Sequence, residues 1–367
     1  MKYKFLLFFA TLSFAISCKN SKNYPITITK EANDCVTQAD TLEDSLPDTL
    51  TISMVGDIMM GTTFPKNRLP ENGGANLFDD CKAILQGSDI TVGNLESVML
   101  EGGETWKKPS PKCFAFRTPP EYAEWLIDAG FDFVGTANNH ANDFLADGAK
   151  KTRELLDSIG LAACGWAGKR TYQIVERKGI KFGFTAFSRD AYNLCSLDEE
   201  LVDSIIRDLK TRCDILVVSL HAGAEGLAET HLPDEMEYFC NEPRGYVRQM
   251  TKQMIDAGAD VIFCHGPHVP RCVDVYNGKF IAYSLGNFCT ISMGISGYCG
   301  LAPLIKIKVD ANGNFLNGKI YSFRQLPSRG PRLDKKNEAA KLIKQRTAED
   351  CPNSPLAISD NGEITFQ

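Results

Sequence analysis

Four of the five histidines in this 367-residue chain follow short apolar runs of the kind that form buried strands. Such runs end at His140, His221 and His265, and His268 follows the last of them by three residues. A fourth run, TISMVGD, ends at Asp57. Imidazole nitrogens and carboxylate oxygens are ligands for divalent metal ions. Because ligand crevices in α/β folds form at the carboxyl ends of strands, this placement predicts one shared metal site.

More polar side chains follow the same predicted strands. Glu96, in VGNLES, is a second carboxylate at a strand end. Asn138, Asn139 and His140 occur together in TANNHAND, where asparagine offers a neutral oxygen ligand and the histidine can bind metal or act as an acid. Asp143 could orient the His140 ring through a hydrogen bond without binding the metal itself. Taken alone, each of these motifs is also compatible with an ordinary turn that caps a helix or strand.

Two further motifs carry the remaining histidines. His221 and Glu225, in HAGAEG, resemble a ligand and a nearby carboxylate, with glycines that let a substrate approach closely. A Gly-Pro pair separates His265 from His268 and stiffens the turn between them. A single histidine could be structural, but the shared position of four favours a site. His231 lies in a polar stretch and is left outside it.

Strand-like and helix-like stretches alternate from residue 51 onward and must position these side chains. Strands are expected at 51–57, 88–97, 131–136, 213–221 and 259–265, helices at 77–87, 119–130, 149–160, 196–212 and 244–258, and hairpins at 171–188, 272–288 and 301–323. Residues 101–118 read as a long loop. Early β-α-β units followed by hairpins predict two sheets packed face to face with helices outside, a four-layer α/β/β/α sandwich.

The ends of the chain differ from its middle. Residues 1–17 have two lysines, an apolar stretch and small residues, which predicts an export signal. Cys18 follows a lipobox-like tripeptide and is the expected lipid-bearing residue, although an ordinary signal peptide cleaved nearby is the alternative. Residues 18–48 read as a linker, 49–329 as the folded domain and 330–367 as a polar tail.

The amino-acid composition argues against several classes of function. Removal of residues 1–17 deletes two lysines and no acids, which changes the net charge from −6 to −8. A chain with this charge is a poor partner for nucleic acid. None of the thirteen cysteines forms a CxxC pair, so the sequence suggests neither a zinc knuckle nor a thioredoxin motif. Most are expected to pack as small apolar residues, and export would permit disulfides without assigning a pairing.

Six blocks of the chain together resemble one known family. In order, they are VGDIMMG, VGNLES, TANNHANDFLADG, SLHAGAE, GADVIFCHGPHVPR and IAYSLGNF. Across about residues 50–325 they are similar to the bacterial capsule-synthesis CapA family, also called the poly-γ-glutamate biosynthesis family. The resemblance implies the fold of calcineurin-like metallophosphoesterases. It also implies a site lined by Asp57, Glu96, Asn139, His140, His221, His265 and His268, with Asn287 nearby.

The chain departs from the related patterns at two places. Metallophosphoesterases usually have Asp-x-His where this chain has Asp57, Ile58 and Met59, so one imidazole is missing. The CapA family often has His-Trp-Gly-x-Glu, whereas Ala222 here replaces the tryptophan. The first departure removes one potential ligand of a two-metal centre. The second removes an aromatic side chain and so changes how a substrate would fit.

Residues 1–18 predict a lipoprotein on a bacterial membrane, periplasmic or at the cell surface. The resemblance implies a metal-dependent hydrolase or transferase site for an anionic polymer or peptide. Asp57, Asn139, His221 and His265 are expected to hold one or two divalent ions, with His268 as a further ligand, Glu96 as a bridging or water-positioning carboxylate, His140 as the acid, and Asn138, Glu225 and Asn287 towards the substrate. Two alternatives remain open. One is a non-catalytic module that binds the polymer for membrane polyglutamate synthase components, and the other is a phosphodiesterase unrelated to capsule.

Overall fold

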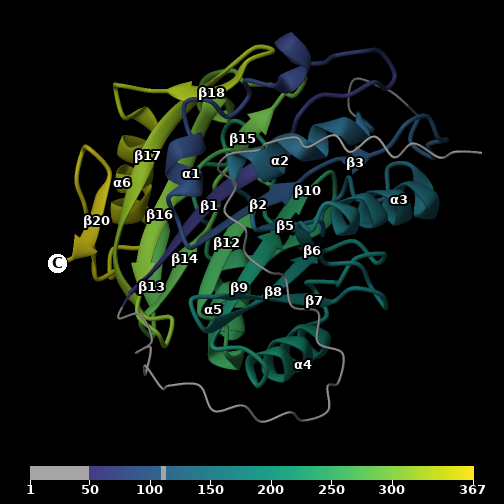
Figure 1. Ribbon diagram of the computed structural model, residues 1–367. Helices are drawn as coiled ribbons and strands as arrows, with labels where there is room; N and C mark the ends of the chain where they lie inside the picture. The colour runs from purple at the N-terminus through teal and green to yellow at the C-terminus, as the bar shows by residue number, and fades with distance from the viewer. Residues whose placement is uncertain (1–48, 109–112) are drawn as a thin grey trace, which may run out of the picture. The chain divides into compact units, whose positions relative to one another are not determined.

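Two β-sheets, one of ten strands and one of six, form the centre of the computed structural model (Figure 1). The structure describes residues 49–108 and 113–367. The predicted export signal, Cys18 and the linker up to residue 48 lie outside the described residues. Within the described residues, no helix combines the length and the apolar composition needed to cross a membrane.

The larger sheet is arranged around strand β1 (Leu50–Met59). All of β1 except Thr51 is buried, as expected for a strand that is covered on both faces. Parallel pairing runs from β1 through β2 and β5 to β6, and on its other side β1 pairs antiparallel with β16 and parallel with β15. The other members of this sheet are β2 (Ile90–Leu95), β5 (Phe133–Gly135), β6 (Ala162–Cys164), β15 (Asn287–Thr290), β16 (Leu301–Val309), β17 (Phe315–Leu326), β18 (Gly330–Leu333), β19 (Leu356–Ile358) and β20 (Glu363–Phe366).

The smaller sheet has a parallel centre and antiparallel edges. Its order is β13-β14-β12-β9-β8-β7. These strands are β7 (Tyr172–Arg177), β8 (Ile180–Ser188), β9 (Ile215–His221), β12 (Val261–His265), β13 (Val273–Tyr276) and β14 (Lys279–Ala282). Two short ribbons lie apart from both sheets: β3 (Val98–Met99) with β4 (Arg117–Thr118), and β10 (Glu237–Phe239) with β11 (Glu242–Gly245).

The three predicted hairpins are confirmed as β7–β8, β13–β14 and β16–β17. Their turn residues explain the first two. Lys178 and Gly179 both have positive φ, as do Asn277 and Gly278. A two-residue hairpin turn of this kind matches the twist of its strands, and asparagine and glycine adopt it with little strain.

Helices cover the outer faces of both sheets. On the larger sheet, apolar residues of α1 (Lys82–Gln86), α2 (Ala123–Ala129) and α3 (Leu145–Ser158) pack against those of β1 and β16. On the smaller sheet, α4 (Glu199–Lys210) and α5 (Val247–Ala257) pack against β9 and β12. A third cluster lies between the sheets, where the rings of Phe133 and Phe184 stack with centroids 4.6 Å apart. The predicted four-layer α/β/β/α sandwich is confirmed (Figure 1).

The boundaries of α4 follow directly from the sequence. The Asp198 carboxylate accepts a hydrogen bond from the Leu201 main-chain N–H, which caps the first turn. Acidic residues occupy that turn and basic residues the last one, in accord with the helix dipole. The predicted helix at 77–87 is shorter, because only Lys82–Gln86 is α-helical and the residues before it form turns. Short 3-10 turns occur at η1 (Glu71–Gly74), η2 (Pro120–Tyr122) and η3 (Gly297–Gly300).

The domain does not end at Arg329 as the sequence analysis expects. Residues 330–367 form β18, helix α6 (Glu338–Asp350), β19 and β20. Strands β18 and β20 pair with β17, and β19 pairs with β20, so the larger sheet extends through this segment. Ile343 and Ile364 are fully buried in the cluster between the sheets. The segment is polar on average because only a minority of its side chains face the core.

Candidate metal centre

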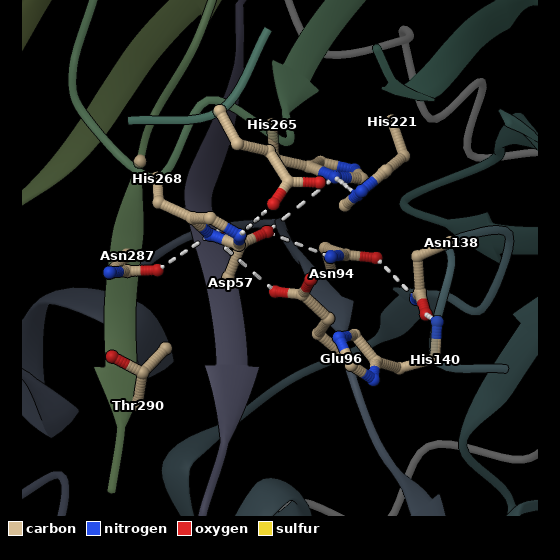
Figure 2. A network of polar contacts seen from close by, with 12 residues as sticks. Asp57, Asn94, Glu96, Asn138, His140, His221, His265, His268, Asn287 and Thr290 are labelled. Atoms are coloured by element: carbon tan, nitrogen blue, oxygen red, sulfur yellow. Dashed lines mark hydrogen bonds and ion pairs between the residues drawn. The ribbon is translucent and has the colours of Figure 1, made fainter. Parts of the chain in front are cut away.

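Strands of both sheets place polar side chains at their carboxyl ends. In the larger sheet, Asp57 and Asn94, near the carboxyl ends of β1 and β2, lie beside Asn287, which is the first residue of β15. In the smaller sheet, His221 of β9 pairs in register with His265 of β12. Figure 2 shows these side chains converging on one point between the sheets. The predicted convergence at strand ends is therefore seen in the structure.

A close approach of main chains sets the position of Asp57. Its N–H donates to the Gly286 carbonyl at 2.9 Å, and the pairing of β1 with its neighbours shifts at this point. A Cβ atom on Gly56 would lie only 1.8 Å from the Gly286 oxygen. Glycine is thus required at residue 56, and the bulge turns the Asp57 carboxylate towards the smaller sheet.

Asp57 belongs to two groups of potential metal ligands. The first group is Asp57, His221 and His265, and the second is Asp57, Glu96 and His268; within each group, one donor atom per residue lies within 4.8 Å of the others. Asp57 Oδ1 is 3.6 Å from His265 Nδ1, and Oδ2 is 3.0 Å from His268 Nδ1. His221 Nδ1 is 3.0 Å from His265 Nδ1. One carboxylate is therefore shared between two adjacent sets of donors.

Burial and neighbouring charges shift the pKa values of four side chains in this centre. Burial raises the pKa of Glu96 well above its ordinary value, and the neighbouring Asp57 carboxylate adds to the effect. Burial lowers the pKa of His221 well below its ordinary value and that of His265 to about 4, so both imidazoles are neutral at pH 7. Burial opposes a charge on His268, but Glu96 and Asp57 outweigh it and raise its pKa to about 10. In the metal-free protein His268 is therefore a cation, and it would have to release its proton to become a metal ligand.

Several buried atoms of the centre make no hydrogen bond within the described part of the chain. They are both carboxylate oxygens of Glu96, His221 Nε2 and Asn139 Oδ1. Buried polar atoms in proteins are nearly always paired, so a set without partners at one place calls for an explanation. All four atoms are metal-ligating types, and all can accept a cation. The residues present therefore fit a divalent metal ion.

Neighbouring side chains hold the ligands in place. Asn94 Nδ2 donates to Asp57 Oδ1 at 2.8 Å, and Asn138 Nδ2 donates to Asn94 Oδ1 at 3.0 Å. Asn138 Oδ1 accepts from the main-chain N–H of His140 (Figure 2). Both ends of the Asn138 amide thus make hydrogen bonds inside the protein, and the contact of Asn138 with a substrate stays a prediction. Ser219 Oγ lies 2.8 Å from His265 Nε2.

His140 is held by a buried carboxylate. His140 Nδ1 lies 2.8 Å from Asp143 Oδ2, the contact expected from the sequence. The same carboxylate accepts the Phe116 N–H at 2.7 Å and forms an ion pair with Lys107 Nζ at 2.5 Å. Burial lowers the pKa of His140, although Asp143 opposes the shift. Lys107, which lies in the predicted loop, also donates to the Asn139 carbonyl, so the described part of the loop around Lys107 is fastened to this side of the site.

Glu225 and Asn287 both lie beside His268. Glu225 Oε2 is 3.9 Å from His268 Nε2, and its other oxygen is 3.0 Å from Arg244. Asn287 Oδ1 is 3.0 Å from His268 Nδ1. His268 itself has a φ of 61°, a left-handed conformation that costs a non-glycine residue energy. Such strain is concentrated at functional sites.

Sequence reasoning missed three residues of the centre. Asn94 stands on β2 two residues before Glu96, which directly follows that strand, and Ser219 stands two residues before His221 on β9, so the two-residue period of a strand could have identified both. No local sequence pattern marks Lys107 as part of the centre. His231, which was left outside the predicted site, lies 2.9 Å from Asp350, and Met59 is fully buried.

Comparisons with known proteins agree with this picture. The PGA biosynthesis protein CapA of Bacillus subtilis is 31% identical over 256 residues, which are 66% of this chain and 63% of that protein. The capsule biosynthesis protein CapA of Bacillus anthracis is 32% identical over 259 residues, 65% of this chain and 59% of that protein. This chain thus spans less than two thirds of the length of either relative.

Among solved structures, a 5′-nucleotidase precursor from Thermus thermophilus matches with 11% identity and a TM-score of 0.42, covering 83% of this chain and 59% of that one. That similarity is weak, and the fold assignment rests on the strand order. The model of the family described as bacterial capsule synthesis protein PGA_cap matches residues 51–291, more than half of the chain. The protein therefore belongs to the bacterial capsule synthesis protein family, PGA_cap.

Proposed function

We propose that this protein is an accessory factor of capsule or polyglutamate biosynthesis whose metal centre serves hydrolysis or transfer on an anionic polymer or peptide. The observation that carries the metal centre is that Asp57 belongs to two groups of potential ligands at once. Family membership supports the biosynthetic context. The polymer itself is part of the proposal, because the names of the two relatives describe proteins that are longer than the matched region.

The ligand types indicate which ions would bind. Asp57, His221 and His265 would hold one ion, and Asp57, Glu96 and His268 a second one. The Asn139 side-chain oxygen offers a further neutral donor. Mixed imidazole and carboxylate donors suit first-row transition metals and zinc. A divalent ion held by these residues would supply Lewis acidity to the amide or phosphoester group of a substrate.

The protein's own residues orient the reaction. The contact between Ser219 Oγ and His265 Nε2 fixes the ring so that Nδ1 faces Asp57. Asp143 engages His140 at Nδ1, which leaves His140 Nε2 to exchange a proton with the substrate. Lys107 neutralises Asp143 from the other side. Glu225 and Asn287, on either side of the His268 ring, would contact the substrate.

The proposal includes a location at a membrane. Export through residues 1–17 and lipidation of Cys18 would tether the domain beside membrane polyglutamate synthase components. Incorporation of labelled palmitate in the native host tests this, with wild type labelled and Cys18→Ala unlabelled. Equal labelling of both proteins, or of neither, would exclude Cys18 as the anchor.

The metal centre is tested by metal analysis of the purified protein followed by turnover assays. We expect about one or two equivalents of a transition metal or zinc in wild type, and a loss of most of it in Asp57→Asn and His221→Ala. His231→Ala, which changes a histidine outside the centre, is the control and should retain the metal. γ-Glutamyl amides and phosphoesters are the substrates to screen. If His140→Ala and His221→Ala leave every hydrolytic and capsule phenotype intact, the enzymatic proposal fails.

Met59 favours a second candidate function. An imidazole is missing where metallophosphoesterases usually supply one, and Met59 is fully buried. A centre weakened in this way could bind the polymer for a synthase without turning it over. Binding of poly-γ-glutamate to the Asp57→Asn protein with wild-type affinity, together with no turnover by wild type, would favour this function.

A further inference from the structure

Two buried cysteines from distant parts of the chain have their sulfur atoms in contact. Cys272 directly precedes β13, and Cys351 follows the last residue of α6. Their Sγ atoms are 3.6 Å apart, and the two residues are 0% and 6% exposed. Other buried thiols, such as Cys81 and Cys213, lie against main-chain carbonyl oxygens instead. The pair thus has a geometry that an isolated packing thiol does not have.

The surroundings of the pair are held firmly. Val273 N–H donates to Thr347 Oγ1 at 3.1 Å, which fastens β13 to the last turn of α6. Arg248 of α5 donates to the Asp350 carbonyl at 2.9 Å and also lies 3.6 Å from Cys351 Sγ. A disulfide has an S–S length near 2.05 Å, so the sulfurs need to approach by about 1.5 Å. Side-chain rotation and small main-chain shifts can supply that movement.

We propose that Cys272 and Cys351 are an oxidisable dithiol that closes into a disulfide between β13 and α6 when the chain meets a disulfide oxidant. Cys351 is the attacking thiol, because it is the more accessible of the two. The contact with Cys272, together with the nearby Arg248, lowers the pKa of Cys351, whereas burial raises that of Cys272 well above its ordinary value. A lower thiol pKa at ambient pH increases the thiolate fraction that reacts.

The reaction is thiol–disulfide exchange in two steps. The Cys351 thiolate attacks one sulfur of the oxidant, a bond forms between them, and the other sulfur leaves as a thiolate that takes up the proton lost from Cys351. Cys272, after loss of its proton, then attacks Cys351 Sγ and releases the second thiol of the oxidant. The two cysteines are oxidised and one disulfide molecule is reduced to two thiols. The product ties α6 to the segment that carries His265 and His268.

Tryptic digestion places the two cysteines on separate peptides, so a disulfide between them can be detected directly. Cleavage after Arg271, Lys279 and Arg346 releases peptides 272–279 and 347–367, each with one cysteine. The purified full chain is reduced, incubated with glutathione disulfide, blocked with N-ethylmaleimide and digested. We expect the two peptides joined in a product that separates on reduction. Recovery of both peptides unlinked, as maleimide or glutathione adducts, would overturn the proposal.

A second measurement uses stability and does not depend on digestion. A bond that closes a loop of this length should raise the Tm of the oxidised protein by about 5–10 °C over the reduced protein. Cys351→Ser and Cys272→Ser should lose the difference, and Cys213→Ser, a buried cysteine with a carbonyl contact, should keep it. An equal Tm for oxidised and reduced wild type, or a difference that persists in Cys351→Ser, would contradict the pairing.

Discussion

Asp57 organises the centre because its two carboxylate oxygens face different neighbours. Oδ1 accepts from Asn94 and lies 3.6 Å from His265, while Oδ2 lies 3.0 Å from His268. Glu96 adds a second buried carboxylate nearby, and its oxygens make no hydrogen bond to any residue that the structure describes. Two buried carboxylates held close together are unfavourable unless a cation joins them. At the residue scale, the centre is therefore arranged for a cation and not for stability alone.

The substitution Glu96→Gln should stabilise the metal-free protein and weaken metal binding. The raised pKa of Glu96 means that its ionised form is disfavoured in the folded state. Wild type therefore loses stability as pH rises above the ordinary glutamate pKa of about 4.3, and the uncharged amide of the variant removes that loss. We expect the variant's Tm to exceed that of the metal-free wild type by about 2–6 °C at pH 7 and to match it near pH 4. Thermal melts with and without metal measure this.

The control for this prediction is Glu242→Gln, which changes a half-exposed carboxylate. Its Tm should differ little from wild type at either pH. A Glu96→Gln protein that is less stable than metal-free wild type at pH 7, or that binds metal as tightly, would contradict the assigned role of Glu96.

The substitution Asp143→Asn should lower turnover while the metal stays bound. Asp143 is fully buried, holds His140 Nδ1 and pairs with Lys107, but it belongs to neither ligand group. Loss of the carboxylate behind a functional histidine typically costs about 10–100-fold in activity. The measurement is turnover of the best substrate from the screen, with metal content determined on the same sample. Asp350→Asn is a matched control, because Asp350 holds His231 at a similar distance outside the centre. Equal losses in the two variants would argue against a special role for His140.

The histidines could be predicted from the sequence, whereas much of their support could not. His140, His221, His265 and His268 stand at strand ends, and strand ends are visible as the last residues of apolar runs. Lys107 reaches Asp143 from a loop without periodicity, so only the folded chain brings the two together. The hydrogen bond from the Asn138 amide to Asn94 likewise depends on the pairing of two strands that are far apart in the sequence.

At the scale of elements, the junction of β1 and β15 determines where the centre lies. The β1 bulge at Asp57 and the Gly286 carbonyl fit together with no room for a side chain on Gly56. The pairing of β9 with β12 then brings His221 and His265 to the same point from the second sheet. Each ligand group thus contains residues from both sheets, so the facing arrangement of the sheets is necessary for the site.

The substitution Gly56→Ala should disrupt this junction. The added Cβ would lie 1.8 Å from the Gly286 oxygen, so β1 and β15 must separate. We expect a loss of about 2–4 kcal/mol in the free energy of unfolding and weaker metal binding. Urea unfolding and metal titration measure the two effects. Gly294→Ala is the control, since a Cβ there meets nothing within 4 Å. Unchanged stability of Gly56→Ala would show that the junction is not rigid.

Elements whose residues form a recognisable local pattern were predicted from the sequence, and elements that lack such a pattern were missed. Asn277 and Gly278 marked the β13–β14 hairpin, because their positive φ angles belong to a known turn type. The short strands β19 and β20 have three and four residues; β20 pairs with β17, and β19 pairs with β20. Their residues carry no period long enough to separate them from a polar tail.

At the scale of the whole molecule, the last 38 residues complete the larger sheet and close one end of the core between the sheets. Strand β17 pairs with β16 on one side and with β18 and β20 on the other. Residues of α6, β19 and β20 contribute buried apolar side chains to the central cluster. Without them, the edge of β17 and part of that cluster would face solvent, and such edges promote aggregation.

Truncation after Arg329 should therefore abolish folding to a stable monomer. Removal of the segment exposes the cluster that Ile343, Leu356, Ile358 and Ile364 help to bury. Each large apolar side chain withdrawn from a core costs about 2–5 kcal/mol, so the four together cost an amount comparable with the roughly 5–15 kcal/mol by which a typical domain is stable. Size-exclusion chromatography and thermal melts should find aggregate, or no cooperative transition. Removal of residues 1–48, predicted from sequence to be export signal and linker, is the control and should leave the transition intact. A truncated protein that elutes as a monomer with the wild-type Tm would show that the domain does end at Arg329, because the larger sheet would then hold together without β18, α6, β19 and β20.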